Sequence, residues 1–289
     1  MLADLDLLLI AVFCAADDLL PERVKNARRS VTDAEVVTLC VAQAIMGIVS
    51  DERFLAVAAK RLAHLFPRLP QRPGFHKRRA RLADTIEALI AEFARHSPGW
   101  EDDLLLVDST PVECARSIET TRRSALAAAA DYGYCASHSR FFWGFRLHAL
   151  FALDGTPRAL TLITPKASER EVCLALLERV NRSGPLVVIG DKGYAGRDFA
   201  GQVAQLDATI VRPRRKDEPG RGPHLAPIRQ RIESIFQTCK DLLTLERHGA
   251  RTLHGLRVRL SQRFLALAAA IALNHRLGRP SRSLAPYTT

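Results

Sequence analysis

Two aspartates follow short apolar runs, at positions where buried strands are expected to end. Asp108 comes directly after Leu104–Val107, and Asp191 follows Leu186–Ile189 and one glycine. Continuous apolar runs of this length are typical of strands buried on both faces. If the two strands are parallel neighbours, both carboxylates emerge at the edge where open α/β sheets bind ligands. Two carboxylates so close repel unless a cation lies between them, and Mg²⁺ takes such oxygen ligands. The sequence therefore predicts a magnesium site shared by Asp108 and Asp191.

A third acidic residue, Glu233, stands on a helix predicted to begin near Pro227. At about 100° per residue, Arg229, Glu233 and Lys240 fall within roughly 40° of one another, beside the apolar face of that helix. One interpretation is a third metal ligand flanked by two phosphate-binding cations. The other is a set of intrahelical ion pairs, worth a few tenths of a kcal/mol each. A bound phosphate would offset the unfavourable placement of Arg229 in the first helical turn.

Two further basic stretches are candidates for contact with DNA phosphates. One runs from Arg72 to Arg81, and the other is the proline-rich stretch from Arg212 to Pro223. Each has a second interpretation, as a solvated turn in the first case and a solvated linker in the second. The full set of predicted DNA contacts is Lys77, Arg78, Arg79, Lys192, Arg214, Arg215, Lys216, Arg229 and Lys240.

The overall composition supports a nucleic-acid partner. The chain of 289 residues has 42 Lys and Arg against 31 Asp and Glu, a net charge of +11 and a pI near 9.8. A pI above about 9 is one mark of nucleic-acid binders, because neutralising phosphates releases counterions. The six cysteines form no close pair, which argues against a zinc ribbon and suits a reducing cytosol. The acidic start and short apolar runs predict neither export nor membrane insertion.

The order of predicted elements indicates an all-α region followed by an α/β domain. Residues 1–100 read as helical, with a capping box at Thr32–Glu35. From Trp100 the pattern gives a strand, a hairpin of two strands, and then helices alternating with two more strands. That order predicts an RNase-H-like mixed five-stranded sheet with flanking helices. The expected strands are 104–107, 141–153, 158–163, 186–189 and 208–211. We assign residues 1–100 to DNA binding, 101–277 to catalysis and 278–289 to a tail.

The three acids also carry a resemblance to a known family. Asp108 in Leu-Val-Asp-Ser-Thr-Pro, Asp191 in Ile-Gly-Asp-Lys-Gly-Tyr and the final glutamate helix resemble the catalytic core of DDE-type bacterial insertion-sequence transposases. A group of these enzymes carries the signature Y-x2-R-x3-E-x6-K around its glutamate. Arg229, Glu233 and Lys240 match that signature at the right spacing.

Other stretches extend the resemblance, with one departure. Gly133–Ser137 followed by Phe142–His148 is similar to the insertion-sequence family catalogued as 982, and the similarity runs from the N-terminal helices to about Leu277. Ala226 stands where the signature has tyrosine. This departure affects the contact that the tyrosine would make near the scissile phosphate, but not the metal site.

The resemblance implies a function and its cofactors. Asp108, Asp191 and Glu233 would hold two Mg²⁺ ions, or Mn²⁺ in their place, which clamp the attacking and leaving oxygens at phosphorus. Water would free a 3′-hydroxyl at the element's end, and that hydroxyl would attack target DNA. The implied partners are double-stranded DNA, as terminal inverted repeats and target, and a second copy of the chain in a homodimer on DNA. The implied location is the bacterial cytoplasm, in association with the nucleoid.

Two other functions would also use acidic residues or basic charge of this kind. A phosphatase of the haloacid-dehalogenase type needs an aspartate two residues after its nucleophile, where Thr110 stands, and an acid where Ala195 stands. A catalytically decayed, DNA-binding derivative of a transposase is the stronger rival. Metal-dependent cleavage of terminal-repeat DNA separates that rival from an active enzyme.

Overall fold

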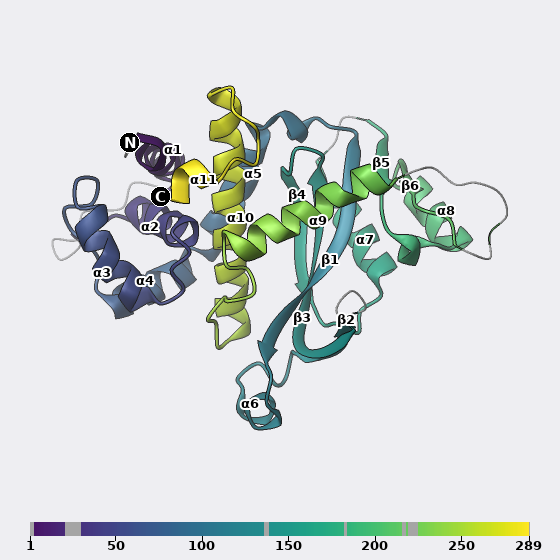
Figure 1. Cartoon of the computed structure of the whole chain (residues 1–289), viewed down its shortest axis with the longest axis horizontal. Coiled ribbons are helices and arrows are strands. Elements are labelled where there is room, and N and C mark those ends of the chain that lie inside the picture. The colour runs from purple at the N-terminus through teal and green to yellow at the C-terminus, as the bar shows by residue number, and fades with distance from the viewer. Residues whose placement is uncertain are drawn as a thin grey trace. The chain divides into compact units, whose positions relative to one another are not determined.

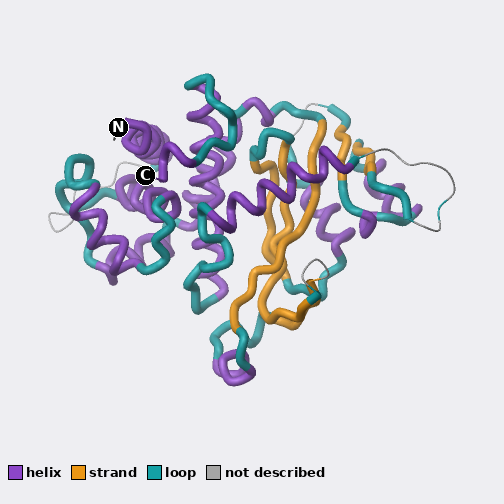
Figure 2. The backbone as a smooth tube through the Cα atoms, viewed as in Figure 1, coloured by secondary structure: helices purple, strands orange, loops and turns teal. Residues whose placement is uncertain are grey.

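The computed structural model describes residues 3–20, 30–135, 139–181, 184–215, 218 and 225–288. The chain divides into two compact units. A helical unit combines Met1–Ser97 with Thr238–Thr289, and a sheet unit comprises Pro98–Gln237. All the strands, drawn in orange in Figure 2, belong to the sheet unit. Within the described ranges, every helix is too short or too polar to span a lipid bilayer.

The helical unit is built around one long apolar helix. Its elements are α1 (Ala3–Leu19), α2 (Asp33–Ile45), α3 (Asp51–Arg61), α4 (Arg72–Arg81), α5 (Ala83–Arg95), α10 (Leu253–Arg276) and α11 (Ala285–Thr288). Helix α10 packs against α5 and α2 and is buried along most of its length. The predicted capping box is confirmed, since Thr32 and Glu35 bond to each other's backbone N–H at the start of α2. The compact helical unit thus joins both ends of the chain. The functional boundaries at residues 100 and 277 stay predictions.

The sheet has one strand more than the sequence predicted. Its strands are β1 (Leu104–Ala115), β2 (Asp131–Cys135), β3 (Arg140–Ala152), β4 (Pro157–Ile163), β5 (Leu186–Ile189) and β6 (Ala208–Val211). They are ordered β2-β3-β1-β5-β6, with β4 also paired to β3. Strands β1 to β4 pair antiparallel, whereas β5 is parallel to β1 and β6. This is the RNase-H-like arrangement, and the additional strand is β2.

Helices cover both faces of this sheet. The sheet unit contains α6 (Ile118–Arg123), α7 (Glu169–Leu177), α8 (Arg197–Gln205) and most of α9 (Ala226–Asp241). On one face, Leu105, Val107 and Leu150 join the buried core that includes α7 and α8. On the other face, the ring of Phe151 meets that of Phe236 on α9 edge-on, with centroids 5.6 Å apart. Figure 1 shows α9 crossing one face of the sheet with α7 beyond it.

The prediction that Asp108 ends its strand is wrong. Strand β1 runs on to Ala115, and Asp108 pairs with Ala149 inside it. The apolar run predicted only the part buried on both faces. Strand β5 pairs with β1 only over Leu104–Leu106, whereas the longer β3 goes on pairing beyond it. Asp108 therefore lies in the strand but past its parallel neighbour.

Candidate active site

Asp108 and Asp191 occupy equivalent positions on two neighbouring parallel strands. The last pair in the β1–β5 register is Leu106 with Ile189, and each aspartate comes two residues after it. The backbones remain close at this point, because a Cβ on Gly190 would lie 3.1 Å from Cγ1 of Val107. Burial is the largest cause of the raised pKa of Asp108, and the negative charge of Asp191 adds to it. The parallel neighbours expected from the sequence are therefore confirmed, and they place Asp108 and Asp191 at the same level of the sheet.

Strand alternation decides which face of the sheet Asp108 occupies. Successive side chains of a strand point to opposite faces, and paired residues point to the same one. Asp108 pairs with Ala149, which shares its face with Phe151, two residues further along β3. Phe151 contacts Phe236 of α9. Asp108 therefore lies on the face that α9 covers, and its neighbour Ser109 on the face that α7 covers.

Asp191 begins a tight turn that its own side chain stabilises. Its Oδ1 accepts a hydrogen bond of 2.7 Å from the N–H of Gly193, at the start of the short helix η3 (Lys192–Tyr194). Arg170 of α7 donates from Nε to the carbonyl of Gly193 across 3.2 Å. The aromatic ring of Tyr194 fills the space over Gly190, where a Cβ would lie 2.7 Å from Cδ2. The tyrosine is buried, in keeping with a packing role.

The surroundings of Asp108 disfavour its charged form. Burial is the largest cause, and together with the charges of Asp191 and Glu169 it raises the pKa of Asp108 to about 7. A hydrogen bond of 2.7 Å from the N–H of Ser109 to Oδ1 acts in the opposite direction, as does the positive charge of Arg229. A carboxylate in such a setting gains most from a cation nearby.

Helix α9 carries both Arg229 and Glu233. Arg229 is partly buried, and its charge lowers the pKa of Asp108. Glu233 is exposed one helical turn further on. Within the described ranges, no three Asp, Glu, His or Cys side chains are already arranged to hold a metal ion. The convergence of Glu233 with the two aspartates stays a prediction.

Glu169, at the start of α7, is a neighbour of the site that the sequence did not reveal. Its Oε1 accepts a hydrogen bond of 2.9 Å from Oγ of Ser109 and forms an ion pair with Arg146 of β3. Acidic residues are common in the first turn of a helix, where they interact favourably with the helix dipole. The sequence therefore offered no reason to single out Glu169. Arg170, beside it, holds the turn after Asp191. Nothing in the residue pattern distinguishes the two from ordinary helix-surface charges.

Two of the basic residues predicted to contact DNA have structural roles instead. Arg79 is only 2% exposed and donates two hydrogen bonds of 2.9 Å to the carboxylate of Asp51. Arg78 binds Asp33 and the carbonyl of Val31, and 12% of its side chain is exposed. The stretch Arg72–Arg81 is a helix, α4, which turns these residues inward. The DNA contacts assigned to Arg78 and Arg79 are corrected accordingly.

The other predicted contacts differ in exposure. Lys77, Lys192, Arg214 and Arg215 are exposed. Arg215 also donates from Nε to the carbonyl of Lys192 across 3.2 Å, which joins the basic stretch after β6 to the turn after Asp191. Lys240 forms an ion pair of 3.2 Å with Glu246. Lys216 lies outside the described residues.

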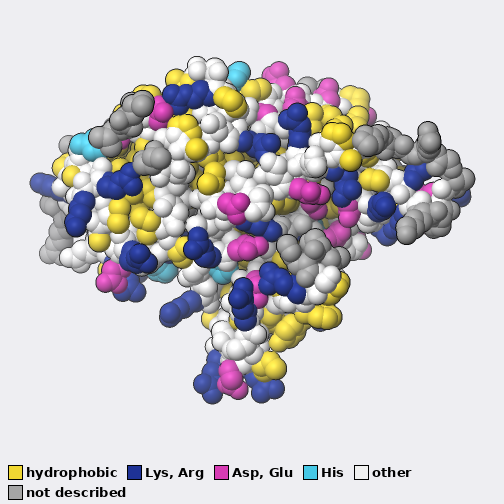
Figure 3. All heavy atoms as spheres, viewed as in Figure 1, with side chains coloured by type: hydrophobic (Ala, Val, Ile, Leu, Met, Phe, Trp, Pro, Cys, Tyr) yellow, Lys and Arg dark blue, Asp and Glu magenta, His cyan; other side chains and the backbone are white. Residues whose placement is uncertain are grey.

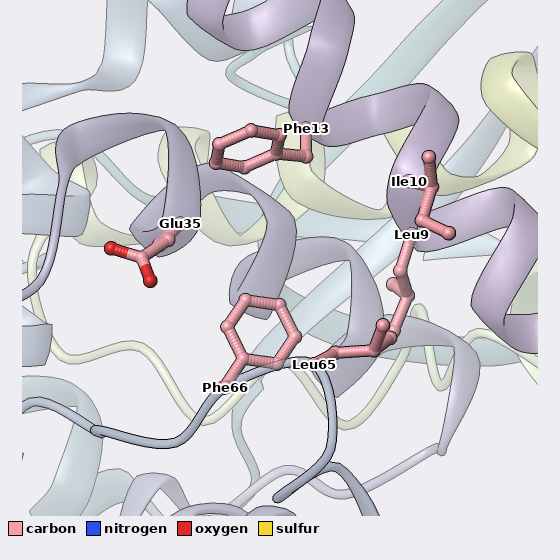
Figure 4. A pocket seen from close by; sticks show the side chains of 6 residues that line it. All are labelled: Leu9, Ile10, Phe13, Glu35, Leu65 and Phe66. Carbon is pink, nitrogen blue, oxygen red and sulfur yellow. The ribbon is translucent and has the colours of Figure 1, made fainter.

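The helical unit also contains a pocket. Its lining is apolar except for one acid, and consists of Leu9, Ile10, Phe13, Glu35, Leu65 and Phe66. Figure 4 shows Glu35 at its side, and this carboxylate accepts the hydrogen bond of the capping box. Among the described residues that line the pocket, none is a nucleophile and Glu35 is the only titratable group.

The fold and the paired aspartates together define the class of protein. An RNase-H-like sheet carries two carboxylates at equivalent positions just past the pairing of its central parallel strands. A family model described as "Transposase DDE domain" matches residues 99–269, more than half of the chain. The chain therefore belongs to the DDE transposase family.

Comparison with other proteins adds distant likenesses. The piggyBac transposase synaptic complex with hairpin DNA is similar at a TM-score of 0.46 and 10% identity, over 99% of this chain and 77% of that one. A pre-cleavage Mos1 transpososome is similar at a TM-score of 0.23 and 11% identity, over 86% and 80%. No curated protein matches. The family assignment rests on the family model.

Proposed function

We propose that this chain is a metal-dependent DNA endonuclease and strand transferase that moves an insertion sequence. One observation carries the proposal: Asp108 and Asp191 each come two residues after the last β1–β5 pair, so two acids from distant segments meet at one place. Family membership supports transposition as the process that this site serves. The reaction would free a 3′-hydroxyl at the element's end and join it to target DNA.

The residues present suit a pair of Mg²⁺ ions. Carboxylate oxygens are the ligands that Mg²⁺ prefers. Oδ1 of each aspartate accepts a local N–H, and no hydrogen bond within the described chain reaches either Oδ2. The Tyr194 hydroxyl is buried nearby without a hydrogen-bond partner in the same ranges. We propose Asp108, Asp191 and Glu233 as the metal ligands. Two bound ions would stabilise the charge that develops on the attacking and leaving oxygens.

The basic residues around the site would position the DNA. Arg229 already acts electrostatically on Asp108, so it is placed to meet a phosphate near the reacting centre. Lys192 is exposed directly after Asp191, and Arg214 and Arg215 follow β6. We also propose Lys77 and Lys240 as phosphate contacts, and a homodimer of the chain on the two ends of the element. Such contacts fix the register of DNA rather than read its sequence.

Cleavage of DNA that carries the ends of the chain's own mobile element tests the proposal. Wild-type protein with Mg²⁺ or Mn²⁺ is expected to cut at the element's boundary and to join the product to a second duplex. Asp108→Asn, Asp191→Asn and Glu233→Gln are each expected to reduce cleavage at least a hundredfold while DNA binding persists. Asp198→Asn, an exposed acid on α8, is the matched control and should cleave normally.

The outcomes separate the enzyme from its main rival. Ala226 in place of the signature tyrosine keeps a decayed, DNA-binding derivative as the second candidate. Binding without cleavage by the wild type, under both metals, would establish that candidate. Normal cleavage by Glu233→Gln would remove the third ligand from the proposal and leave the two aspartates.

A further inference from the structure

The β2–β3 ribbon carries four aromatic side chains on one face. In the antiparallel register, Tyr132 pairs with Trp143 and Tyr134 with Phe141. Paired residues, and residues two apart on one strand, share a face, so all four rings project from the same side. The rings of Tyr134 and Phe141 are in contact, with centroids 5.1 Å apart. We call Tyr132, Tyr134, Phe141 and Trp143 the aromatic face.

The opposite side of the ribbon is packed, which leaves the aromatic face turned outward. A Cβ on Gly133 would lie 2.5 Å from Cβ of Pro165 and 2.7 Å from Cζ of Phe142, so this side has no room even for a methyl group. On the aromatic face, by contrast, Phe141 is 74% exposed, Tyr132 51% and Tyr134 47%. Only Trp143, at the root of the ribbon, is buried. Exposed apolar groups gathered in this way mark an interaction surface.

The aromatic face lies on the same side of the sheet as Asp108. Phe141, Trp143 and Ala149 alternate along β3 and therefore share a face, and Ala149 pairs with Asp108. At about 3.4 Å per residue, Phe141 stands roughly 27 Å along the strand from Ala149. A DNA strand that enters or leaves the proposed active site along this face would pass the exposed rings.

Positive charge borders the aromatic face. Arg116 follows β1, and α6 ends in Arg122 and Arg123, all of them exposed. Arg116 and Arg123 also form ion pairs with Glu113 and Glu119, so three arginines stand against two glutamates here. In Figure 3, hydrophobic side chains gather over the β2–β3 end of the sheet, and Lys and Arg side chains lie below them over α6. Aromatic rings bordered by arginines form the type of surface on which nucleobases stack while phosphates are held alongside.

We propose that the aromatic face is a DNA platform on which unpaired nucleobases of the strand at the active site stack. The inference rests on the proposed function. A second copy of this chain fits less well, since a twofold contact would bring the same arginines of both copies together. Nucleobases present flat rings to Tyr134 and Phe141, and their phosphates complement the arginines. In fully paired DNA the bases are stacked on one another, so their flat faces are not accessible to these rings.

Binding of two DNA probes by the whole chain tests the platform. One probe is a blunt duplex, and the other is the same duplex with a single-stranded extension of about ten thymidines, a length suited to such surfaces. The double variant Tyr134→Ala/Phe141→Ala is expected to bind the extended probe about tenfold more weakly in fluorescence anisotropy, with blunt-duplex binding changed less than twofold. Leu277→Ala, an exposed apolar residue of the helical unit, is the control and should alter neither. Both aromatic side chains are exposed, so thermal unfolding should be unchanged.

Arg122→Gln gives a second, independent measurement. It should weaken binding of both probes and reduce the salt dependence of binding, as loss of a phosphate contact does. An unchanged preference for the extended probe in the double variant would overturn the platform. So would a shift from dimer to monomer in sedimentation without DNA, because the rings would then be a protein contact. If the wild type binds neither probe, the proposed function itself fails.

Discussion

Ser109 donates a hydrogen bond of 2.9 Å to Glu169, although 60 positions separate the two residues in the chain. This bond ties β1, one residue beyond Asp108, to the first turn of α7. The next residue of that turn, Arg170, binds the carbonyl of Gly193 across 3.2 Å and so holds the turn after Asp191. One turn of α7 therefore contacts both segments that carry the site's aspartates.

Removing this contact should loosen the metal site without touching a proposed ligand. Glu169→Ala is expected to weaken Mn²⁺ binding about tenfold, the lower end of the range for residues that orient metal ligands. Glu169→Gln keeps an acceptor for Ser109 and should recover most of the affinity. The measurement is titration of Mn²⁺ by electron paramagnetic resonance, with Glu171→Gln, an exposed acid of the same helix, as control. A Gln variant as weak as the Ala variant would show that the charge of Glu169 matters, rather than its hydrogen bond.

Neutralising Asp108 should stabilise the metal-free protein at neutral pH. Burial raises the pKa of Asp108 from 3.8 to about 7, so the folded state favours the protonated carboxyl. In the wild type, the protonated carboxyl of Asp108 therefore costs no stability below pH 4, and stability is lost as the pH rises through 7. The free energy of unfolding of Asp108→Asn should therefore exceed that of the wild type increasingly across this pH range, by up to about 4 kcal/mol.

Urea unfolding in the presence of a chelator at pH 5 and pH 8 measures this difference. Saturating Mg²⁺ should shrink it, because a bound cation favours the carboxylate. Equal effects of the substitution at both pH values would contradict the shifted pKa.

Arg79 and Lys77 are neighbours on α4, and we expect opposite consequences when each is replaced. Arg79 is buried against Asp51, which also accepts a hydrogen bond of 2.7 Å from Arg259. Arg79→Ala should lower the free energy of unfolding by roughly 1–3 kcal/mol, because the buried carboxylate of Asp51 loses two hydrogen bonds and keeps only its pairing with Arg259 among the arginines. Lys77→Ala should leave stability unchanged and reduce DNA affinity and its salt dependence. Thermal unfolding and anisotropy distinguish the two; a stable Arg79→Ala protein with impaired DNA binding would restore the original prediction for Arg79.

His148 should make the fold sensitive to mild acid. The imidazole is 1% exposed, and neither ring nitrogen has a hydrogen-bond partner in the described chain. Burial, followed by the charge of Arg146, lowers the pKa of His148 from 6.5 to about 4, so the folded state favours the neutral ring. The associated stability is present above pH 6.5 and is lost as the pH falls through 4.

The wild type should lose free energy of unfolding between pH 7 and pH 4, and in His148→Leu this loss should be smaller by up to about 3 kcal/mol. Urea unfolding measures the difference. His275→Gln, at an exposed position, is the control and should behave as the wild type does. An unaltered pH profile in His148→Leu would assign the acid sensitivity to other groups.

The sequence alone determined the order of the elements and the two aspartates. Apolar runs long enough for a strand but too short for a helix revealed the buried parts of β1 and β5. An acid follows the first run directly and the second after one glycine. Strand β2 was not predicted, because Asp131–Cys135 is polar and aromatic, and its rings face outward. Arg79 was predicted to contact DNA because the sequence of a basic cluster does not show which of its side chains pairs with a buried acid.

Only the tertiary structure decided which distant residues meet. The β1–β5 register sets Asp108 and Asp191 at the same level, and the alternation of β1 sends Asp108 toward α9 and Ser109 toward α7. Glu169 became part of the site's surroundings only through the packing of α7 on that second face. A local sequence pattern predicts the secondary structure of a segment and which of its faces is buried. Contacts across 60 positions depend on how separate elements bury their apolar faces together, and no short stretch of sequence records that.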